Sequence, residues 1–230
     1  MNDKIAVLIP ALNPDEKLLK LVAALKQKFS TIVVVNDGST TGRAIFEVLR
    51  HEGVSVLDHL INKGKGAALK TGIGWIRDRC PNVQGVVTAD SDGQHREEDI
   101  ARIAGAISGA GDSIVLGVRA FRGEVPFRSR LGNLATRRLF RLLTGLAIKD
   151  TQTGLRGIPR DMFDRMLRIG GDKYEYEMRV LADCKHHAKP PLQIDIDTVY
   201  LDGNASSHFS PIRDSIKIWV ALIKYAVMGR

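Results

Sequence analysis

The sequence has 230 residues, enough to bury a full core, and its 44% apolar content excludes a disordered chain. The formal net charge of +8 would mean little if it were dispersed, but its concentration in one segment favours a polyanionic partner such as phosphate groups, anionic lipid or nucleic acid. A membrane span is not expected, because no run reaches the ~18 apolar residues that a spanning helix needs.

The first half of the chain alternates short apolar runs with helical periodicity. The predicted strands cover residues 4–10, 32–35, 54–57, 86–89 and 113–118. The predicted helices between them cover 18–29, 42–51, 62–76 and 97–107. This alternation predicts right-handed βαβ units, and therefore an α/β fold whose mostly parallel, Rossmann-like sheet carries helices on both faces.

The alternation ends near Gly123. We expect a helix at 128–143, a polar turn at 150–154, a short helix after Pro159, another helix from 174, a strand at 192–201 and a helix at 211–228. The chain is therefore divided into a catalytic domain at 1–210 and a C-terminal amphipathic helix at 211–230.

Two acidic residues follow the fourth predicted strand. If Asp90 and Asp92 continue the strand alternation, both carboxylates point the same way, at the edge where open α/β sheets bind ligands. With Gln94 close behind, these oxygen donors suit Mg²⁺ or Mn²⁺ carrying a phosphate. The alternative is a solvated turn in which the aspartates only cap the next helix.

The positive charge is concentrated in one segment. Residues 119–141 contain seven arginines and one acid, Glu124, so this segment alone carries +6. Forked guanidinium donors match phosphate, and the alternative is a solvated basic helix face.

The last predicted helix is mostly apolar. Arg213, Lys217 and Lys224 form a narrow basic ridge on it, and aliphatic residues and Trp219 cover most of the remainder. That pattern fits a helix in a lipid interface or against a separate membrane-anchor protein. The alternatives are docking on its own sheet or in a homo-oligomer. No signal peptide is predicted, and Cys80 and Cys184 are expected to be free thiols in a reducing cytosol. We therefore expect a cytoplasmic protein, peripheral at the inner face of the membrane.

Five motifs, in order, resemble the inverting glycosyltransferases of family 2 with the GT-A fold, and most closely the polyprenyl-phosphate sugar transferases related to dolichyl-phosphate mannose synthase. They are IPALN at 9–13, VNDGS at 35–39, NKGKGAA at 62–68, ADSDGQH at 89–95 and DTQTGLR at 150–156. The resemblance implies a nucleotide-sugar donor, a divalent metal and a polyprenyl-phosphate acceptor.

The resemblance also implies roles for individual residues. The nucleotide pocket would be built from Pro10, Ala11, Asn13, Glu16, Asp37, Lys65, Asp90 and Ser91. Asp90, Asp92 and Gln94 would hold the metal, and the acceptor phosphate would meet Arg119, Arg128, Arg130 and Gln152. The catalytic set would be Asp92, Arg119, Arg130 and Asp150. Many relatives have Glu directly after the first motif, whereas Pro14 and Asp15 intervene here, so either Asp15 or Glu16 would make the acidic contact.

Three other functions compete. A sugar-hydroxyl acceptor, as in cell-surface polysaccharide synthesis, would need a carboxylate base, for which Asp150, Glu175 and Glu177 are candidates. A sugar-1-phosphate nucleotidyltransferase would need a glycine-rich loop that residues 10–16 lack. A nucleic-acid-binding module is disfavoured because aromatic residues make up only 6% of the chain and do not interleave with the arginines.

Overall fold

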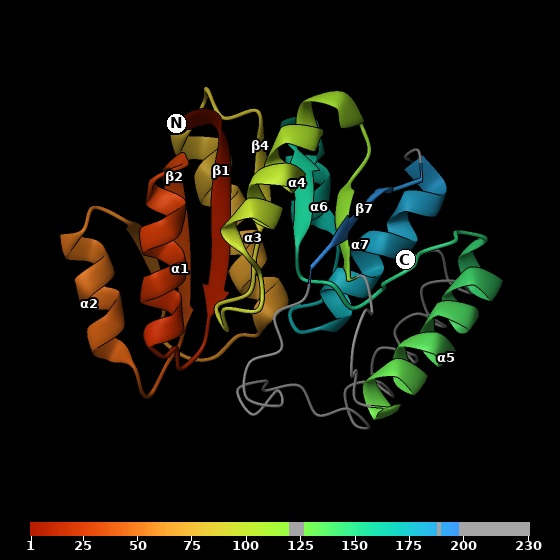
Figure 1. The fold of residues 1–230 in the computed structure, drawn as a ribbon, viewed down its shortest axis with the longest axis horizontal. Helices are drawn as coiled ribbons and strands as arrows, with labels where there is room; N and C mark the ends of the chain where they lie inside the picture. Colours follow the sequence, from red (N-terminus) through yellow and green to blue (C-terminus); the bar gives the residue numbers. More distant parts are fainter. Residues whose placement is uncertain (120–126, 188–189, 198–230) are drawn as a thin grey trace.

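A computed structural model describes residues 1–119, 127–187 and 190–197, and for 127–135 and His187 it describes the backbone alone. The described strands are β1 (Asn2–Ala11), β2 (Phe29–Asp37), β3 (Ser55–His59), β4 (Gly85–Thr88), β5 (Val115–Arg119), β6 (Arg156–Pro159) and β7 (Leu192–Ile196). The described helices are α1 (Glu16–Lys26), α2 (Arg43–His51), α3 (Lys65–Arg79), α4 (Glu97–Ala110), α5 (Phe127–Thr144), α6 (Phe163–Arg168) and α7 (Glu175–His187), with a 3₁₀ turn at Arg160–Met162. The alternation of strands and helices over the first half is confirmed (Figure 1).

The strands form one sheet in the order β3-β2-β1-β4-β6-β5-β7. All described pairings are parallel except those of β6, which runs antiparallel to both β4 and β5. Strand β6 was not predicted, because its four residues follow a turn-forming cluster and carry no strand-length apolar run. The mostly parallel α/β sheet is confirmed, with β6 inserted between two strands of the common direction.

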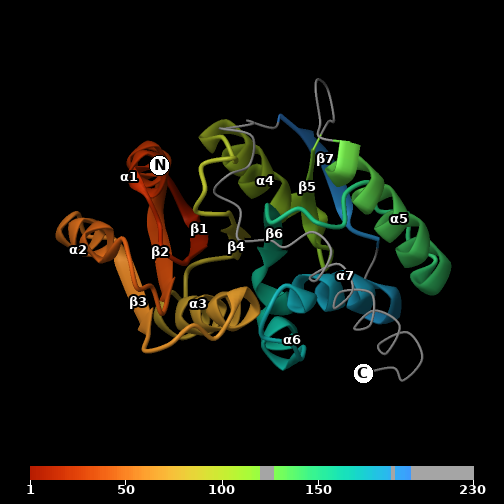
Figure 2. The same ribbon diagram turned by 90° about the horizontal axis from the view of Figure 1, so that it is seen from below.

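Helices cover both faces of the sheet because the buried strands are apolar on both sides. Along β1, Val7 and Ile9 pack with α1, α2 and α4, whereas Ala6 and Leu8 pack with α3, α6 and α7. Figure 2 shows the sheet between these two helical layers. Gly72 of α3 lies so close to β1 that an added Cβ would come within 2.1 Å of a Leu8 methyl carbon.

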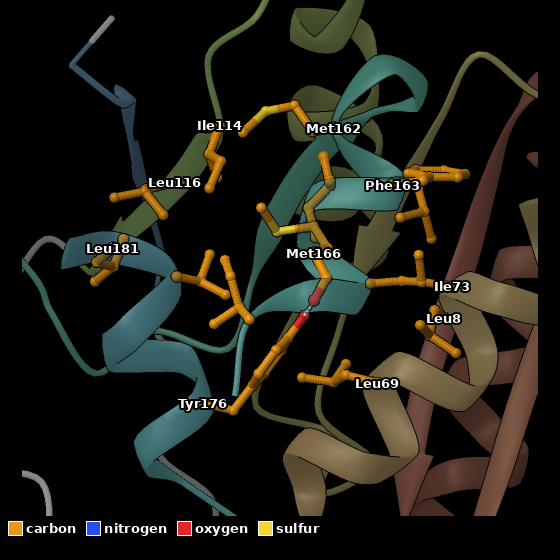
Figure 3. Packing of buried hydrophobic residues seen from close by; sticks show 14 of the residues in the cluster. Leu8, Leu69, Ile73, Ile114, Leu116, Met162, Phe163, Met166, Tyr176 and Leu181 are labelled. Atoms are coloured by element: carbon orange, nitrogen blue, oxygen red, sulfur yellow. Dashed lines mark hydrogen bonds between the residues drawn. The ribbon is translucent and has the colours of Figure 1, made fainter. Parts of the chain in front are cut away.

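Helix α7 is anchored beside α3 and α6, in the helical layer on the Ala6 and Leu8 side of the sheet. The hydroxyl of Tyr176 donates a hydrogen bond to the carbonyl of Met166, at 3.0 Å, while the ring packs among the buried side chains (Figure 3). This bond fixes the first turn of α7, and therefore the position of the next residue, Glu177.

Several boundaries differ from the predictions. Phe29, expected at the end of the first helix, begins β2. The helix ends at Lys26, and Phe29 pairs with Asn2 of β1 instead. The last predicted strand is confirmed as β7 to Ile196, and its remainder, the terminal helix and the 1–210/211–230 division lie outside the described residues. No helix in the described part of the chain has the length and apolarity that a membrane crossing requires.

Candidate functional site

Three strand ends bring polar residues to one edge of the sheet. Strands β1, β2 and β4 are parallel, so Asn13, Asp37 and Asp90 all lie at or just beyond their carboxyl ends. The predicted convergence on this edge is confirmed.

The prediction that strand alternation orients the Asp90 and Asp92 carboxylates is wrong. Strand β4 ends at Thr88, so both aspartates lie in a loop, and strand alternation does not orient them. The last residue of β4 paired with β1 is Thr88, and the backbone N–H of Ala89 still donates to the carbonyl of Leu8 at 3.0 Å. The chain then turns at Gly93, with φ of +76°, and the Asp92 carboxylate accepts the backbone N–H of Gln94 at 3.0 Å.

Asp90 is the centre of a charged cluster built from three elements. Its Oδ1 lies 2.7 Å from the Lys65 Nζ at the start of α3, and its Oδ2 lies 3.3 Å from the His95 Nε2. The same Lys65 Nζ lies 3.0 Å from Glu177 Oε2 in the first turn of α7. Lys65 therefore bridges two carboxylates that are 87 positions apart in the numbering.

The cluster changes the proton affinities of its members. Burial alone would raise the pKa of Asp90, but the charges of Lys65 and His95 hold it well below its usual range. Burial alone would lower the pKa of Lys65, but Asp90 and Glu177 raise it above its ordinary value. Lys65 and Asp90 therefore form a fully charged pair at neutral pH.

The pKa of Asp92 is shifted in the opposite direction to that of Asp90. Burial, and then the negative charge of Asp90, raise its pKa above the ordinary value. The two aspartates are therefore close enough for their charges to interact, and a cation between them would relieve the repulsion.

Arg119 is held at the end of β5 by a buried carboxylate. Its Nε and Nη2 donate to the two oxygens of Asp150, at 2.6 and 3.1 Å, and Asp150 is fully buried. Asp150 also accepts the backbone N–H of Gln152 at 3.0 Å. The bidentate contact fixes the guanidinium plane, and Asp150 is a positioning residue for Arg119 in this structure.

A cleft opens between these two charged groups. It is lined by Asp90, Gln94, His95, Arg119, Gln152, Thr153, Gly154, Ile196 and Asp197. The loop before β6 borders it closely, because a Cβ at Gly154 would come within 2.4 Å of the Asp90 carboxylate. A larger residue at position 154 would have to displace the Asp90 carboxylate.

The β1–β3 side of the edge uses its polar side chains differently. The Asn13 Oδ1 accepts the backbone N–H groups of Thr40 and Thr41, at 2.8 and 3.0 Å. Asp37 accepts those of Lys63 and Gly64, at 2.9 and 2.8 Å, and lies 2.7 Å from the His59 Nδ1. Asp37 is only 4% exposed, so these internal bonds occupy its carboxylate.

The remaining nucleotide-pocket candidates surround this region. Pro10 and Ala11 are buried at the end of β1, Asp15 caps α1 by accepting the backbone N–H of Lys17, and Glu16 opens that helix. Ser91 follows Asp90 in the loop after β4. Their contacts with a nucleotide stay predictions.

The predicted acceptor residues are only partly placed. Arg119 and Gln152 line the cleft, whereas Arg128 and Arg130 lie on α5, where the structure describes the backbone alone. Thr153, Ile196 and Asp197 had no predicted role, and Glu177 was predicted only as a candidate base. The Glu177–Lys65 contact joins the NKGKGAA motif to the first turn of α7, and no local pattern marks it.

The donor set fits a divalent cation shared with a ligand. Among the described residues no three His, Cys, Asp or Glu side chains form a metal-binding group. Asp90 and Asp92, the second with its pKa raised by burial and then by the charge of the first, would leave further coordination positions to phosphate oxygens. Asp90, Asp92 and Gln94 are the residues that would hold such an ion.

Comparison with known proteins places these features in a family. The model described as "Glycosyl transferase family 2" matches residues 6–167. The chain is 28% identical over 227 residues to a UDP-N-acetylglucosamine–dolichyl-phosphate N-acetylglucosaminyltransferase of Methanococcus voltae, covering 88% of both chains. It is 29% identical over 170 residues to a polyprenol monophosphomannose synthase of Mycolicibacterium smegmatis, covering 70% of this chain and 63% of that protein.

A solved structure supports the fold. Glucosyl-3-phosphoglycerate synthase from Mycobacterium tuberculosis, in complex with Mn²⁺, UDP and glucosyl-3-phosphoglycerate, aligns with a TM-score of 0.72 at 16% identity. The alignment covers 98% of this chain and 80% of that one. The observed sheet is therefore the GT-A arrangement that the motifs implied, and the chain, a glycosyltransferase, belongs to glycosyl transferase family 2.

Proposed function

We propose that the protein is a metal-dependent inverting transferase that moves a sugar from a UDP- or GDP-sugar to a polyprenyl phosphate. The observation that carries this proposal is one cleft whose lining includes both Asp90 and Arg119, the latter held by Asp150. The aspartate suits a metal-bound diphosphate on the donor side, and the arginine suits an anionic acceptor on the acceptor side.

The donor side has to stabilise a leaving group. Displacing a nucleoside diphosphate from the sugar develops negative charge on its phosphate oxygens. A Mg²⁺ or Mn²⁺ ion bound by Asp90 and Asp92 would supply Lewis-acid stabilisation of that charge. Lys65, kept charged between Asp90 and Glu177, adds a fixed positive charge at the same edge of the sheet.

The acceptor side favours a phosphate over a hydroxyl. A lipid phosphate is already anionic at neutral pH and needs orientation rather than a general base, and Arg119 is preorganised for that. A hydroxyl would need a carboxylate base. Asp150 is buried against Arg119, Glu177 is paired with Lys65, and Glu175 accepts the backbone N–H groups of Asp172 and Lys173.

The names of the relatives point the same way. The Methanococcus protein is named for a dolichyl-phosphate acceptor and the Mycolicibacterium protein for a polyprenol monophosphate product. The structural neighbour was crystallised with Mn²⁺ or Mg²⁺ and UDP. These names support a nucleotide-sugar donor and a divalent ion, and the proposed lipid acceptor itself requires contact with a membrane, at which we propose a peripheral location on the cytoplasmic face.

The test is transfer of radiolabelled sugar to polyprenyl phosphate in detergent, with UDP- and GDP-sugars, with and without Mn²⁺. We expect transfer from one donor class, lost on chelation, and at least ~10³-fold lower kcat in Asp92→Asn, because the metal loses an anionic ligand. The variant should melt no lower than the wild type, because burial and then the charge of Asp90 disfavour the charged form of Asp92. Transfer to a free sugar hydroxyl but not to the lipid phosphate, or full activity in Asp92→Asn, would contradict the proposal.

A further inference from the structure

Two neighbouring aliphatic side chains project into solvent from the loop between β3 and α3. Leu60 is 99% exposed and Ile61 is 69% exposed. Among the described residues, no other two exposed large hydrophobic side chains are adjacent in the sequence. Isolated exposed aliphatics are ordinary on protein surfaces, but two together at a loop tip would gain from leaving water.

Buried hydrogen bonds hold this loop at both ends. Before the pair, the His59 side chain lies 2.7 Å from Asp37 and 3.0 Å from the Thr71 hydroxyl. After it, Asp37 accepts the backbone N–H groups of Lys63 and Gly64. The buried carboxylate of Asp37 therefore fixes the loop in the conformation that exposes Leu60 and Ile61.

A close backbone contact fixes the middle of the loop. A Cβ at Gly38, whose φ is +71°, would come within 2.2 Å of the carbonyl carbon of Ile61. The loop backbone thus packs against the end of β2, and its two aliphatic side chains stay outside.

The loop lies at the same sheet edge as the candidate site. It follows the carboxyl end of β3, and β3, β2, β1 and β4 are consecutive parallel strands. Three interstrand spacings separate β3 from β4, or about 14 Å. Figure 2, seen from below, shows the connection from β3 to α3 on the side of the sheet away from α5.

The exposed cations near the pair are lysines. Lys63 is exposed in the same loop, and the exposed Lys173 lies against Gly64 at the end of that loop, whereas Lys65 is taken up by Asp90 and Glu177. The preceding acid, Asp58, pairs with Arg50 and accepts a hydrogen bond from Asn36. An aliphatic tip beside an exposed lysine is complementary to an anionic lipid surface.

We propose that Leu60 and Ile61 insert into the interfacial region of an anionic bilayer and turn the carboxyl edge of the sheet towards the membrane. The inference rests on the proposed function in one respect: a polyprenyl-phosphate acceptor resides in such a membrane. The occupant is lipid rather than the donor nucleotide.

The first experiment is flotation with phosphatidylglycerol vesicles and with phosphatidylcholine vesicles, both free of polyprenyl phosphate. We expect the wild type to bind the anionic vesicles. Binding should fall about tenfold or more in Leu60→Ser/Ile61→Ser, since the two aliphatic side chains that would be buried in the bilayer are removed. The matched control is Leu192→Ser, which changes an exposed leucine at the opposite, amino end of β7. Wild-type protein that does not float, or equal losses in both variants, would overturn the proposal.

The second experiment detects insertion directly. Leu60→Trp should show a blue-shifted emission and quenching by brominated lipids after subtraction of the wild-type signal, whereas Leu192→Trp should show neither. Nucleotide and Mn²⁺ binding by Leu60→Ser/Ile61→Ser, followed calorimetrically, should match the wild type. Weaker nucleotide binding with unchanged flotation would assign the loop to the donor pocket instead and overturn the proposal.

These outcomes are separable from those of the proposed function. Transfer to polyprenyl phosphate in detergent depends on the cleft and not on vesicle binding. A protein that transfers sugar in detergent but floats independently of the loop defeats this inference alone. One that floats through the loop but does not transfer to the lipid phosphate defeats the proposed acceptor alone.

Discussion

The two halves of the sheet edge use polar residues for different purposes. In the β1–β3 half, Asn13 and Asp37 accept backbone N–H groups and hold loops in place. In the β4–β7 half, charged side chains pair with other charged side chains, as in Lys65–Asp90–Glu177 and Arg119–Asp150. Bonds to backbone build a fixed surface, whereas ion pairs can exchange one partner for a ligand. We therefore expect the first half to hold loops in place and the second half to bind ligands.

The largest expected effect comes from breaking the Arg119–Asp150 pair. Arg119→Met should lower the free energy of unfolding by about 3 kcal/mol, because it leaves a buried carboxylate without its cation. Arg119→Met/Asp150→Leu should recover most of that stability and none of the transfer activity. Urea unfolding and transfer assays on the same variants measure both. Recovery of activity in the double variant would show that the pair serves the fold alone.

An intermediate effect concerns acid stability. The folded-state pKa of Asp90 lies well below its ordinary value, so its charged form stabilises the fold above pH ~4, and that contribution is lost as the pH falls. The pKa of Asp92 is raised in the folded state, so ionisation of Asp92 lowers the stability of the fold as the pH rises above the ordinary pKa of an aspartate.

The unfolding free energy of the wild type should fall as the pH drops below ~5. Asp90→Asn should reduce the slope of that fall by up to about 1.4 kcal/mol per pH unit, the slope that corresponds to one proton. Urea titrations at pH 7, 5 and 4 provide the measurement, with Asp58→Asn as the control for an exposed paired aspartate. Parallel curves for wild type and Asp90→Asn would refute the charged cluster.

The smallest expected effect belongs to the first half. Asp37→Asn replaces one carboxylate oxygen by a donor that cannot accept a backbone N–H, so we expect a loss of about 1–2 kcal/mol in stability. If the internal bonds are its whole role, the affinity for the nucleotide should change little. Thermal unfolding and nucleotide titration separate the two, and a tenfold loss of affinity in a stably folded variant would favour the nucleotide contact that the motif resemblance implies.

The sequence by itself determined much of this protein. Apolar runs alternating with 3.6-residue periodicity specified the βαβ units, because strand and helix periods differ and each buries its own face. Acidic and amide residues following such runs also located the site edge, since parallel strands share a carboxyl end.

Only the tertiary structure decided the rest. Strand β6 forms because β4 and β5 leave room for an antiparallel partner, and its own four residues carry no strong strand signal. Asp150 reads as a base in sequence and proves to be the buried anchor of Arg119. The Lys65–Glu177 contact depends on α3 and α7 meeting across the core. Partner choice among charged groups depends on distance and burial, which the packing of remote elements sets and local sequence does not encode.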